Sequence, residues 1–185
     1  MTDTVEIRCA TEAELPEIWR LAHDEYVRLG YINPQPGRIY IHYQHMECIE
    51  QTTRLVALVD GQVVGTFSYT VDGPAGLYCE VDFPREIRAL RDAGEQIVSV
   101  WRIIVVDHAH RIASELMTEA SRQIVELGEP TVGCVVHPRH VNYYVKRLGF
   151  ERVAETKQTK GLAIAPGVLL LGRKGSYSRL LNIGK

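Results

Sequence analysis

The sequence predicts an α/β fold in which a mixed β-sheet carries helices on both faces. Two β-rich runs flank Asp60-Gly61, which is a strong two-residue signal for a β-hairpin. In the second half of the chain, β-rich runs alternate with segments of helical periodicity, beginning with the apolar run 96–107. The chain has 185 residues, 45% hydrophobic and 24% charged, which is enough for one domain with a substantial core.

The first half of the chain is expected to contain a strand, a long helix and the hairpin. The run 5–10 has the composition of a strand, and apolar residues recur at helical spacing over 11–30. Thr11 and Glu14 form a capping-box pattern at the start of this helix, and Gly30 ends it. A proline-containing loop follows at 31–38, and then a segment of ambiguous pattern at 39–51, in which helix is favoured. The hairpin occupies 54–73.

The second half is expected to build helices and strands around one central strand. Strand 96–107 is apolar almost throughout, so we expect it to be covered on both faces. The helix after it has apolar residues from Ile112 to Leu127 on one face and stops at Gly128. A short surface helix is expected before this strand, at 84–94. After the long helix we expect a strand at 131–136, a second helix at 138–148, a strand from 151 onward and a last strand at 166–174.

Composition argues against several classes of protein. The net charge of -2 does not suit a general nucleic-acid or membrane-surface binder. No run of about 18 apolar residues is present, and the acidic N-terminal stretch lacks the apolar core of a secretory signal. The four cysteines are far apart, which favours reduced thiols in a cytoplasm. Cys9 and Cys134 lie in apolar runs and are expected to be buried.

Three pairs of histidines have spacings that invite a metal interpretation: His42 and His45, His108 and His110, and His137 and His140. Apart from Asp107, no cysteine or carboxylate lies at ligand spacing beside them. We therefore expect surface or loop histidines and no metal site.

Four segments in a fixed order resemble one known superfamily. They are 99–107 ("SVWRIIVVD"), 108–114 ("HAHRIAS"), 131–137 ("TVGCVVH") and 144–150 ("YVKRLGF"). With the order of elements, they resemble the GNAT (Gcn5-related N-acyltransferase) fold over residues 5–174, leaving 175–185 as a C-terminal tail. The resemblance implies a mostly antiparallel sheet that is splayed between the donor strand and the next strand. In that superfamily the donor strand, which corresponds to 99–107, carries the pantetheine arm of the acyl donor. A turn and helix N-terminus, corresponding to 108–114, hold its phosphates, and the acyl group lies in the wedge where the next strand, 131–137, splays away.

Two departures and several motifs resemble a particular branch of this superfamily. The turn at Arg111 lacks the usual glycines, and Tyr144 lies five residues before Gly149, whereas the usual position, four before, is Val145. The motifs are "YVRLGY" at 26–31, "VVGT" at 63–66, "LRDAG" at 90–94 and "HPRHVNYYVKRLGF" at 137–150. These features resemble the N-acyl amino acid synthases (FeeM-like), relatives of the autoinducer (acyl-homoserine-lactone) synthases. The resemblance implies an acyl-phosphopantetheine thioester as co-substrate, from acyl carrier protein rather than coenzyme A.

Amide formation from a thioester needs a neutral amine, N–H donors for the thioester oxygen and a proton for the leaving thiolate. The resemblance puts the oxyanion donors on the backbone around Ile103, Ile104 and Val105. It makes Tyr144 the proton donor, since the pKa values of a phenol and a thiol lie within about two units. The alternative is that Tyr144 and Tyr143 only pack against the sheet, and for Tyr143 core packing is favoured.

The proton acceptor is less obvious. The donor strand of the branch usually begins Glu-x-x-Arg, and residues 99–102 read "SVWR". Ser99 therefore stands where the branch has a carboxylate that helps to take a proton from the amine. His137, at the end of the splayed strand, has a side chain whose pKa range suits a general base.

The remaining candidate residues concern the donor phosphates and a buried charge. The turn that would hold the phosphates contains Arg111, Ile112, Ala113 and Ser114. Arg111 can bind a phosphate with help from the helix dipole, or it can be a solvated surface arginine. Arg102 lies inside an apolar strand and needs a partner. We expect Glu80, Asp82 or the carboxylate of a substrate.

A basic group surrounds the expected phosphate end, with histidines among it: Arg111, Arg139, Lys146 and Arg147, and His108, His110 and His140. It can dock an acidic acyl carrier protein, or simply be a soluble helix face.

We expect a cytoplasmic N-acyltransferase that moves an acyl group to the amine of an amino acid or small molecule. The alternatives are an acetyl-coenzyme A-dependent GNAT N-acetyltransferase and a non-catalytic GNAT-fold protein that binds an acyl ligand or a partner. Ser99 favours the non-catalytic alternative, and Tyr144 and Arg111 oppose it.

Overall fold

The computed structural model of the chain describes residues 4–106, 110–160, 166–176 and 179. Its strands are β1 (Val5–Cys9), β2 (Thr52–Val59), β3 (Gln62–Val71), β4 (Ile97–Val105), β5 (Thr131–Val136), β6 (Glu151–Thr156) and β7 (Gly167–Gly172). Its α-helices are α1 (Leu15–Arg28), α2 (Gln44–Glu47), α3 (Pro84–Asp92), α4 (His110–Glu126) and α5 (Val141–Tyr143). The 3-10 turns are η1 (Glu12–Glu14), η2 (Pro36–Arg38), η3 (Tyr78–Val81) and η4 (Pro138–His140), and η5 (Tyr144–Leu148) is π-helical.

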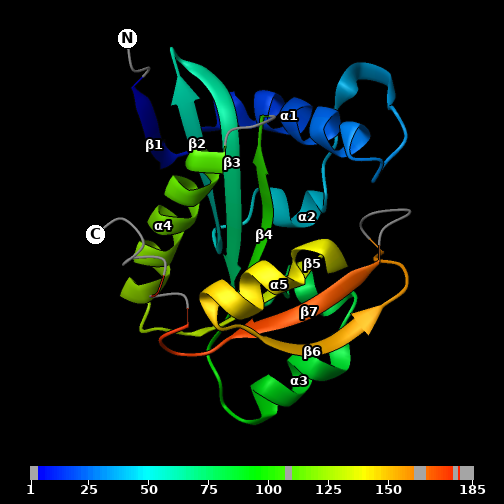
Figure 1. The fold of residues 1–185 in the computed structure, drawn as a ribbon, viewed down its shortest axis with the longest axis vertical. Coiled ribbons are helices and arrows are strands. Elements are labelled where there is room, and N and C mark those ends of the chain that lie inside the picture. Colours follow the sequence, from blue (N-terminus) through cyan, green and yellow to red (C-terminus); the bar gives the residue numbers. More distant parts are fainter. Residues whose placement is uncertain (1–3, 107–109, 161–165, 177–178, 180–185) are drawn as a thin grey trace.

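The described strands form one seven-stranded sheet in the order β1-β2-β3-β4-β5-β7-β6 (Figure 1). β4 and β5 pair in parallel, and the other neighbouring strands pair antiparallel. A crossover through α4 connects the two parallel strands, as a parallel pair requires. The mixed, mostly antiparallel sheet and the order of elements along the chain confirm the predicted fold.

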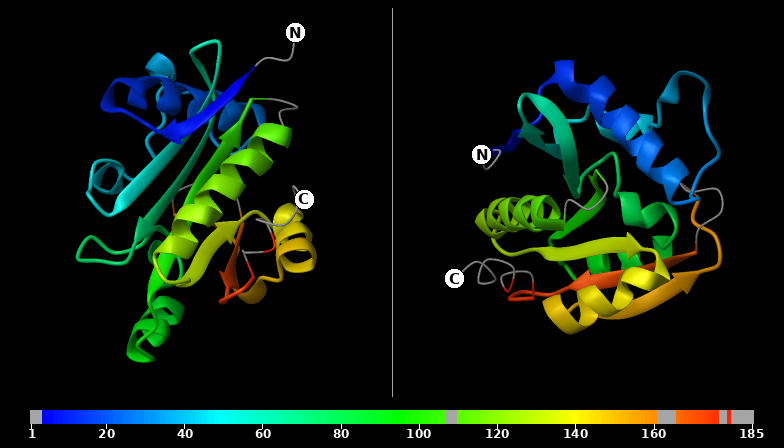
Figure 2. Two further views of the ribbon diagram at one scale, coloured as in Figure 1. Left: turned by 90° about the vertical axis from the view of Figure 1, so that its left-hand side faces the viewer. Right: turned by 45° about the horizontal axis from the view of Figure 1, so that its top comes forward.

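Helices cover both faces of this sheet (Figure 2). Leu116 of α4 and Val98 of β4 belong to the largest cluster of buried side chains. Ile87 of α3 and Ile97 of β4 belong to a cluster on the opposite face. Consecutive residues of β4 are therefore buried on opposite faces, which confirms the prediction of a central strand covered on both sides. Among the described residues, no helix is long and apolar enough to cross a membrane.

The contact between α4 and the hairpin requires a glycine in the "VVGT" motif. A Cβ atom at Gly65 would lie 3.0 Å from Leu116 Cδ1 and 3.1 Å from Val105 Cγ1. Those distances are below ordinary van der Waals contact, so a side chain at Gly65 would push α4 away from the sheet. The motif thus keeps the first turns of α4 close to the end of β4.

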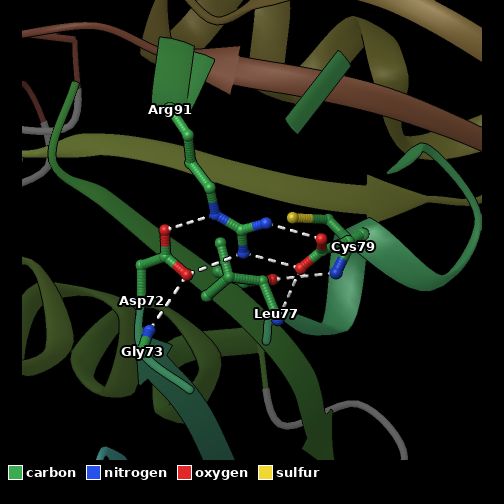
Figure 3. A network of polar contacts seen from close by, with 7 residues as sticks. Asp72, Gly73, Leu77, Cys79 and Arg91 are labelled. Atoms are coloured by element: carbon green, nitrogen blue, oxygen red, sulfur yellow. Dashed lines mark hydrogen bonds and ion pairs between the residues drawn. The ribbon is translucent and has the colours of Figure 1, made fainter. Parts of the chain in front are cut away.

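Arg91, in the last turn of α3, joins three segments (Figure 3). Its Nε and Nη2 each donate to Asp72 at 2.8 Å, just after β3. Its Nη1 and Nη2 donate to Glu80 of η3 at 2.5 and 2.6 Å. The "LRDAG" motif therefore has a structural role, because it fixes η3, whose Tyr78 lines the cavity described below.

We expect Arg91→Met to lower the free energy of unfolding by about 1–2 kcal/mol, because two partly buried carboxylates lose the cation between them. Chemical denaturation measures the loss. Arg88→Met, at an exposed position of the same helix, is the matched control and should change stability by less than about 0.5 kcal/mol. Equal losses in the two variants would show that the ion-pair network does not stabilise the fold.

Some local expectations differ from the structure. Segment 39–51 is helical only over the four residues of α2, because the side chains of Tyr40 and His42 turn into an aromatic cluster and keep this part of the chain irregular. Cys134 is buried as predicted, but Cys9, the last residue of the edge strand β1, is exposed, so the expectation of burial is wrong for it. Of the expected tail, 175–185, the described residues are 175, 176 and 179.

Candidate functional site

β4 and β5 separate part-way along their length. Their pairing runs from Ile97–Thr131 to Val100–Cys134, although β4 continues to Val105 and β5 to Val136. In the described part of the chain no β4–β5 pairing lies beyond that point. Figure 1 shows β2, β3 and β4 running up the molecule while β6 and β7 cross its lower part. The later backbone of β4 therefore faces an opening in the sheet, as the predicted splay requires.

A β-bulge interrupts β4 beside this opening. Two residues, Arg102 and Ile103, oppose the single residue Phe67 of β3, and Arg102 has a left-handed φ of 49°. The bulge puts Trp101 and Arg102 on the same face of the sheet, where both donate to hydroxyl groups of β3, at 3.0 and 2.9 Å. In a regular strand, the charge of Arg102 would lie in the apolar cluster beneath α4.

A cavity of about 580 Å³ occupies the opening and is lined from both faces of the sheet. Ile103, Ile104 and Val105, the predicted oxyanion donors, are among its lining residues. We call the part lined by α4, β5 and the η5 region the apolar pocket: Met117, Ala120, Ser121, Ile124, Val132, Cys134, Tyr144, Leu148 and Phe150. We call the part lined by α1, η3 and nearby segments the aromatic pocket: Glu25, Tyr26, Arg28, Tyr31, His42, Tyr78, Trp101 and Arg102.

A π-helical turn explains the unusual spacing of Tyr144. In η5, the N–H of Gly149 bonds the carbonyls of Tyr144 and Val145, and the N–H of Phe150 bonds the carbonyl of Tyr144 at 3.1 Å. A π-helical turn is wider than an α-helical turn by about one residue. Tyr144, five residues before Gly149, therefore takes the inward position, while Val145 is 37% exposed. The ring of Tyr144 packs edge-on against Phe150, with centroids 5.7 Å apart.

The two adjacent tyrosines lie in different environments. Burial raises the pKa of Tyr144 far above its ordinary value, so the phenol stays protonated at neutral pH. Tyr143 is 40% exposed, which makes the expectation of core packing for it wrong. Consecutive residues of a helix point in different directions, and only Tyr144 packs against the main core.

Aromatic rings surround His42 in the aromatic pocket. The ring centroids of Tyr40, Tyr26 and Tyr78 lie 4.9, 5.0 and 5.5 Å from that of His42. His42 Nε2 lies 3.2 Å from the hydroxyl of Tyr26. His42 lies in the loop before α2, as expected for a loop histidine, but it is only 8% exposed and so is not at the surface. In the described part of the chain, no three His, Cys, Asp or Glu side chains gather as they would around a metal ion.

Arg102 pairs with Glu47 of α2, and the expectation of Glu80 or Asp82 as its partner is wrong. The two side chains are 0% and 1% exposed, and the guanidinium lies 4.7 Å from the centroid of the Trp101 ring. Glu80 binds Arg91 instead, and Asp82 accepts the N–H of Lys160 at 2.8 Å. Arg102 lines the aromatic pocket, and the pair holds its guanidinium in place there.

His137 lies at the rim of the cavity. Its ring stacks on Tyr31 with centroids 5.5 Å apart, and the guanidinium of Arg139 lies 5.1 Å from the same tyrosine ring. His137 Nδ1 accepts the N–H of Arg139 at 3.3 Å. Partial burial and the charge of Arg139 lower the pKa of His137, which keeps the ring neutral at neutral pH. These contacts join the end of β5 to the end of α1 across the opening.

Ser99 is not brought into the cavity. It is fully buried, and its Oγ accepts the N–H of Cys79 in η3 at 3.2 Å. Its side chain thus faces η3, and we propose no catalytic step for it.

The predicted phosphate turn is only partly brought to the cavity. Ala113 and Ser114 line it, and Ile112 packs on the main core. The side chain of Arg111 is 83% exposed and binds Glu115 at 2.7 Å. Residues 107–109, including His108, lie outside the described residues.

The model of the N-acyl amino acid synthase FeeM family matches residues 17–172, which include both pockets. The chain belongs to the FeeM family. It is therefore an acyltransferase, and the predicted resemblance is confirmed.

Solved structures of several acyltransferases share the fold of this FeeM-family chain. The structure of FeeM, an N-acyl amino acid synthase from uncultured soil microbes, is 19% identical with a TM-score of 0.82, over 95% of this chain and 94% of that one. The structure of the coenzyme A-dependent acyl-homoserine lactone synthase BjaI is 16% identical with a TM-score of 0.65, over 97% of this chain and 89% of that one. The structure of an acyl-CoA N-acyltransferase from Pseudomonas aeruginosa is 18% identical with a TM-score of 0.62, over 91% of this chain and 99% of that one. At these identities the likeness shows a shared fold. No curated protein matches the sequence.

Several residues that shape the pockets of this FeeM-family chain were given no pocket role from the sequence. Tyr26 and Tyr31 belong to the motif "YVRLGY" and line the aromatic pocket. His42 and Glu47 lie in the segment of ambiguous pattern, where no periodicity indicates burial. The alternation of aromatic residues and histidine in "IYIHY" was the available signal, because polar tips on an aromatic cluster commonly mark a binding pocket.

Proposed function

We propose that this FeeM-family acyltransferase moves an acyl group from the phosphopantetheine thioester of an acyl carrier protein to the amine of an amino acid or similar small molecule in the cytoplasm. A single cavity that joins the apolar and aromatic pockets beside the β4 bulge carries the proposal. The apolar pocket suits an alkyl chain, and the aromatic pocket suits a small acceptor with polar and ring groups. The thioester then lies between them, at the bulge.

The bulge and Tyr144 supply the two groups that the thioester needs. Backbone N–H groups of a strand point alternately to its two edges, and that of Val106 donates to the carbonyl of Val64, just outside the β4 strand, on the β3 side. The N–H of Val105 therefore points away from β3, and we assign it to stabilise the developing oxyanion. Tyr144, on the side of the apolar pocket, gives its proton to the leaving thiolate. Burial raises the pKa of Tyr144, and the same apolar surroundings raise the pKa of a thiol that enters them. The proton is therefore on Tyr144 when the thiolate leaves.

Features around η5 and α4 favour a protein donor. Exposed Tyr143 and Val145 lie beside the exposed basic residues Lys146 and Arg147, next to the inward-facing Tyr144. Acyl carrier protein is acidic, and a basic patch of this kind would steer it to the cavity. The turn at Arg111 lacks the glycines that let backbone N–H groups reach a pyrophosphate. Coenzyme A remains the alternative donor, since two of the similar structures are of proteins whose names include it.

We expect kcat/KM for an acyl group on acyl carrier protein to exceed that for the same group on coenzyme A by about tenfold or more. Calorimetry with acetyl-coenzyme A should detect no micromolar binding. Steady-state transfer from each donor to a panel of amino acids measures the two kcat/KM values. Equal or better turnover with acyl-coenzyme A would move the assignment to a coenzyme A-dependent enzyme.

Charge reversal separates docking from chemistry. The double variant Lys146→Glu/Arg147→Glu should lower kcat/KM with acyl carrier protein by about tenfold. It should leave transfer from a short N-acetylcysteamine thioester unchanged, because that donor has no carrier protein that must dock on the basic patch. Arg85→Glu/Arg88→Glu makes the same charge change on the exposed face of α3 and should have little effect with either donor.

A further inference from the structure

Amine acylation needs a proton acceptor, and the described lining of the aromatic pocket offers few. Its only carboxylate is Glu25, and Arg28 binds that carboxylate at 2.7 Å. Glu47 lies behind Arg102, and Ser99 faces away toward η3. At the rim, the N–H of Arg139 already occupies His137 Nδ1. With these groups engaged, the imidazole of His42, deeper in the pocket, is the candidate proton acceptor.

His42 lines the cavity, is 8% exposed, and has one ring nitrogen without a hydrogen bond. Nε2 lies 3.2 Å from the hydroxyl of Tyr26, whereas Nδ1 is buried and bonds none of the described groups. A buried polar atom without a partner is costly in a folded protein and is frequently a ligand contact. The groups that face His42 are the rings of Tyr26, Tyr40, Tyr78 and Trp101, together with the charge of Arg102.

The surroundings of His42 keep its ring neutral. Burial, with the charge of Arg102, lowers the pKa of His42 to about 3. Burial also raises the pKa of Tyr26, so its phenol keeps its hydrogen. If His42 Nε2–H donates to the hydroxyl oxygen of Tyr26, the tautomer is fixed and the lone pair lies on Nδ1.

We propose that His42 Nδ1 accepts the proton of the acceptor amine during acyl transfer, with Tyr26 as the positioning residue that fixes its tautomer. The proposal rests on the proposed function. The amine nitrogen forms a bond to the thioester carbon, and that nitrogen becomes positively charged and far more acidic than in the free amine. A neutral imidazole can accept a proton from such a cationic nitrogen. The nitrogen loses its proton to Nδ1, the carbon–sulfur bond breaks, and the thiolate takes the proton of Tyr144. Solvent then takes the proton from His42 and returns one to Tyr144, so that both side chains regain their starting states. The products are an amide and a free thiol.

The test compares acceptors that differ in basicity. With the best amino acid acceptor of a panel, His42→Asn should lower kcat by about 10²-fold, as expected for losing one general base. With hydroxylamine, whose nitrogen is weakly basic and neutral in the assay, the loss should be less than about tenfold. Equal losses with both acceptors would assign His42 a structural role and overturn the proposal, and so would an unchanged kcat. His42→Gln repeats the comparison if the asparagine variant does not fold.

Nitrogen NMR of the wild-type protein supplies a readout that does not depend on turnover. We expect a neutral His42 ring with hydrogen on Nε2 throughout the neutral pH range. Hydrogen on Nδ1, or protonation of the ring near neutral pH, would overturn the proposal. A wild-type protein that acylates no acceptor would instead overturn the proposed function itself, and the role of His42 with it.

Discussion

Tyr144→Phe is expected to lower acyl transfer by about 10²–10³-fold, the typical effect of losing one positioned acid. The phenylalanine ring can keep the edge-on contact with Phe150, so the apolar pocket should retain its shape. Stability should change by less than about 1 kcal/mol, because only a hydroxyl group is removed. Acyl transfer, the thermal midpoint and donor binding, measured together on one preparation, distinguish loss of chemistry from loss of fold.

Tyr143→Phe is the matched control, because the same hydroxyl is removed from a neighbouring residue that is 40% exposed. We expect it to have near wild-type turnover with an N-acetylcysteamine thioester. Wild-type turnover in Tyr144→Phe would exclude this phenol as the proton donor. The apolar pocket would then retain its role as the binding site of the acyl chain, and another group would have to protonate the thiolate.

The fold was predictable because its signals are local. Asp60-Gly61 and the runs on either side of it define a hairpin within a short window. The uniform apolar character of 96–107 indicates burial on both faces, and the structure gives β4 neighbours and helices on both sides. The helix stop at Gly128 and the short motifs fix the order of elements in the same way.

The site was less predictable because it depends on contacts between distant residues. Glu47 and Arg102 are separated by 55 positions, and neither segment carries a pattern that pairs them. The burial of His42 follows from rings supplied by α1, η3 and β4. Tyr144 is an intermediate case. Its spacing from Gly149 was visible in the sequence, but only the π-helical turn shows how the tyrosine rather than Val145 comes to face the pocket.

The buried ion pair provides the largest expected effect on stability. Replacing Arg102 by methionine should lower the free energy of unfolding by about 3–5 kcal/mol, because the carboxylate of Glu47 would stay buried without its cation. The methionine side chain still fills apolar space, so the loss reports mainly on charge. Urea denaturation at neutral pH measures it. A loss of less than about 1 kcal/mol would mean that water reaches the carboxylate and that the pair is not needed for the fold.

The double variant Arg102→Met/Glu47→Leu separates the charge from the shape of the site. Removing both charges should recover most of the lost stability, since a buried ion pair and well-packed apolar side chains of similar volume are often nearly equivalent. Arg102→Lys keeps the positive charge but has a single ammonium, so it cannot bind Glu47 and Ser68 through the separate nitrogens that the guanidinium uses. We expect its stability to lie between those of the wild type and Arg102→Met. If the double variant is as unstable as Arg102→Met alone, the cost comes from the lost contacts of the guanidinium with Ser68 and the Trp101 ring rather than from an unpaired carboxylate.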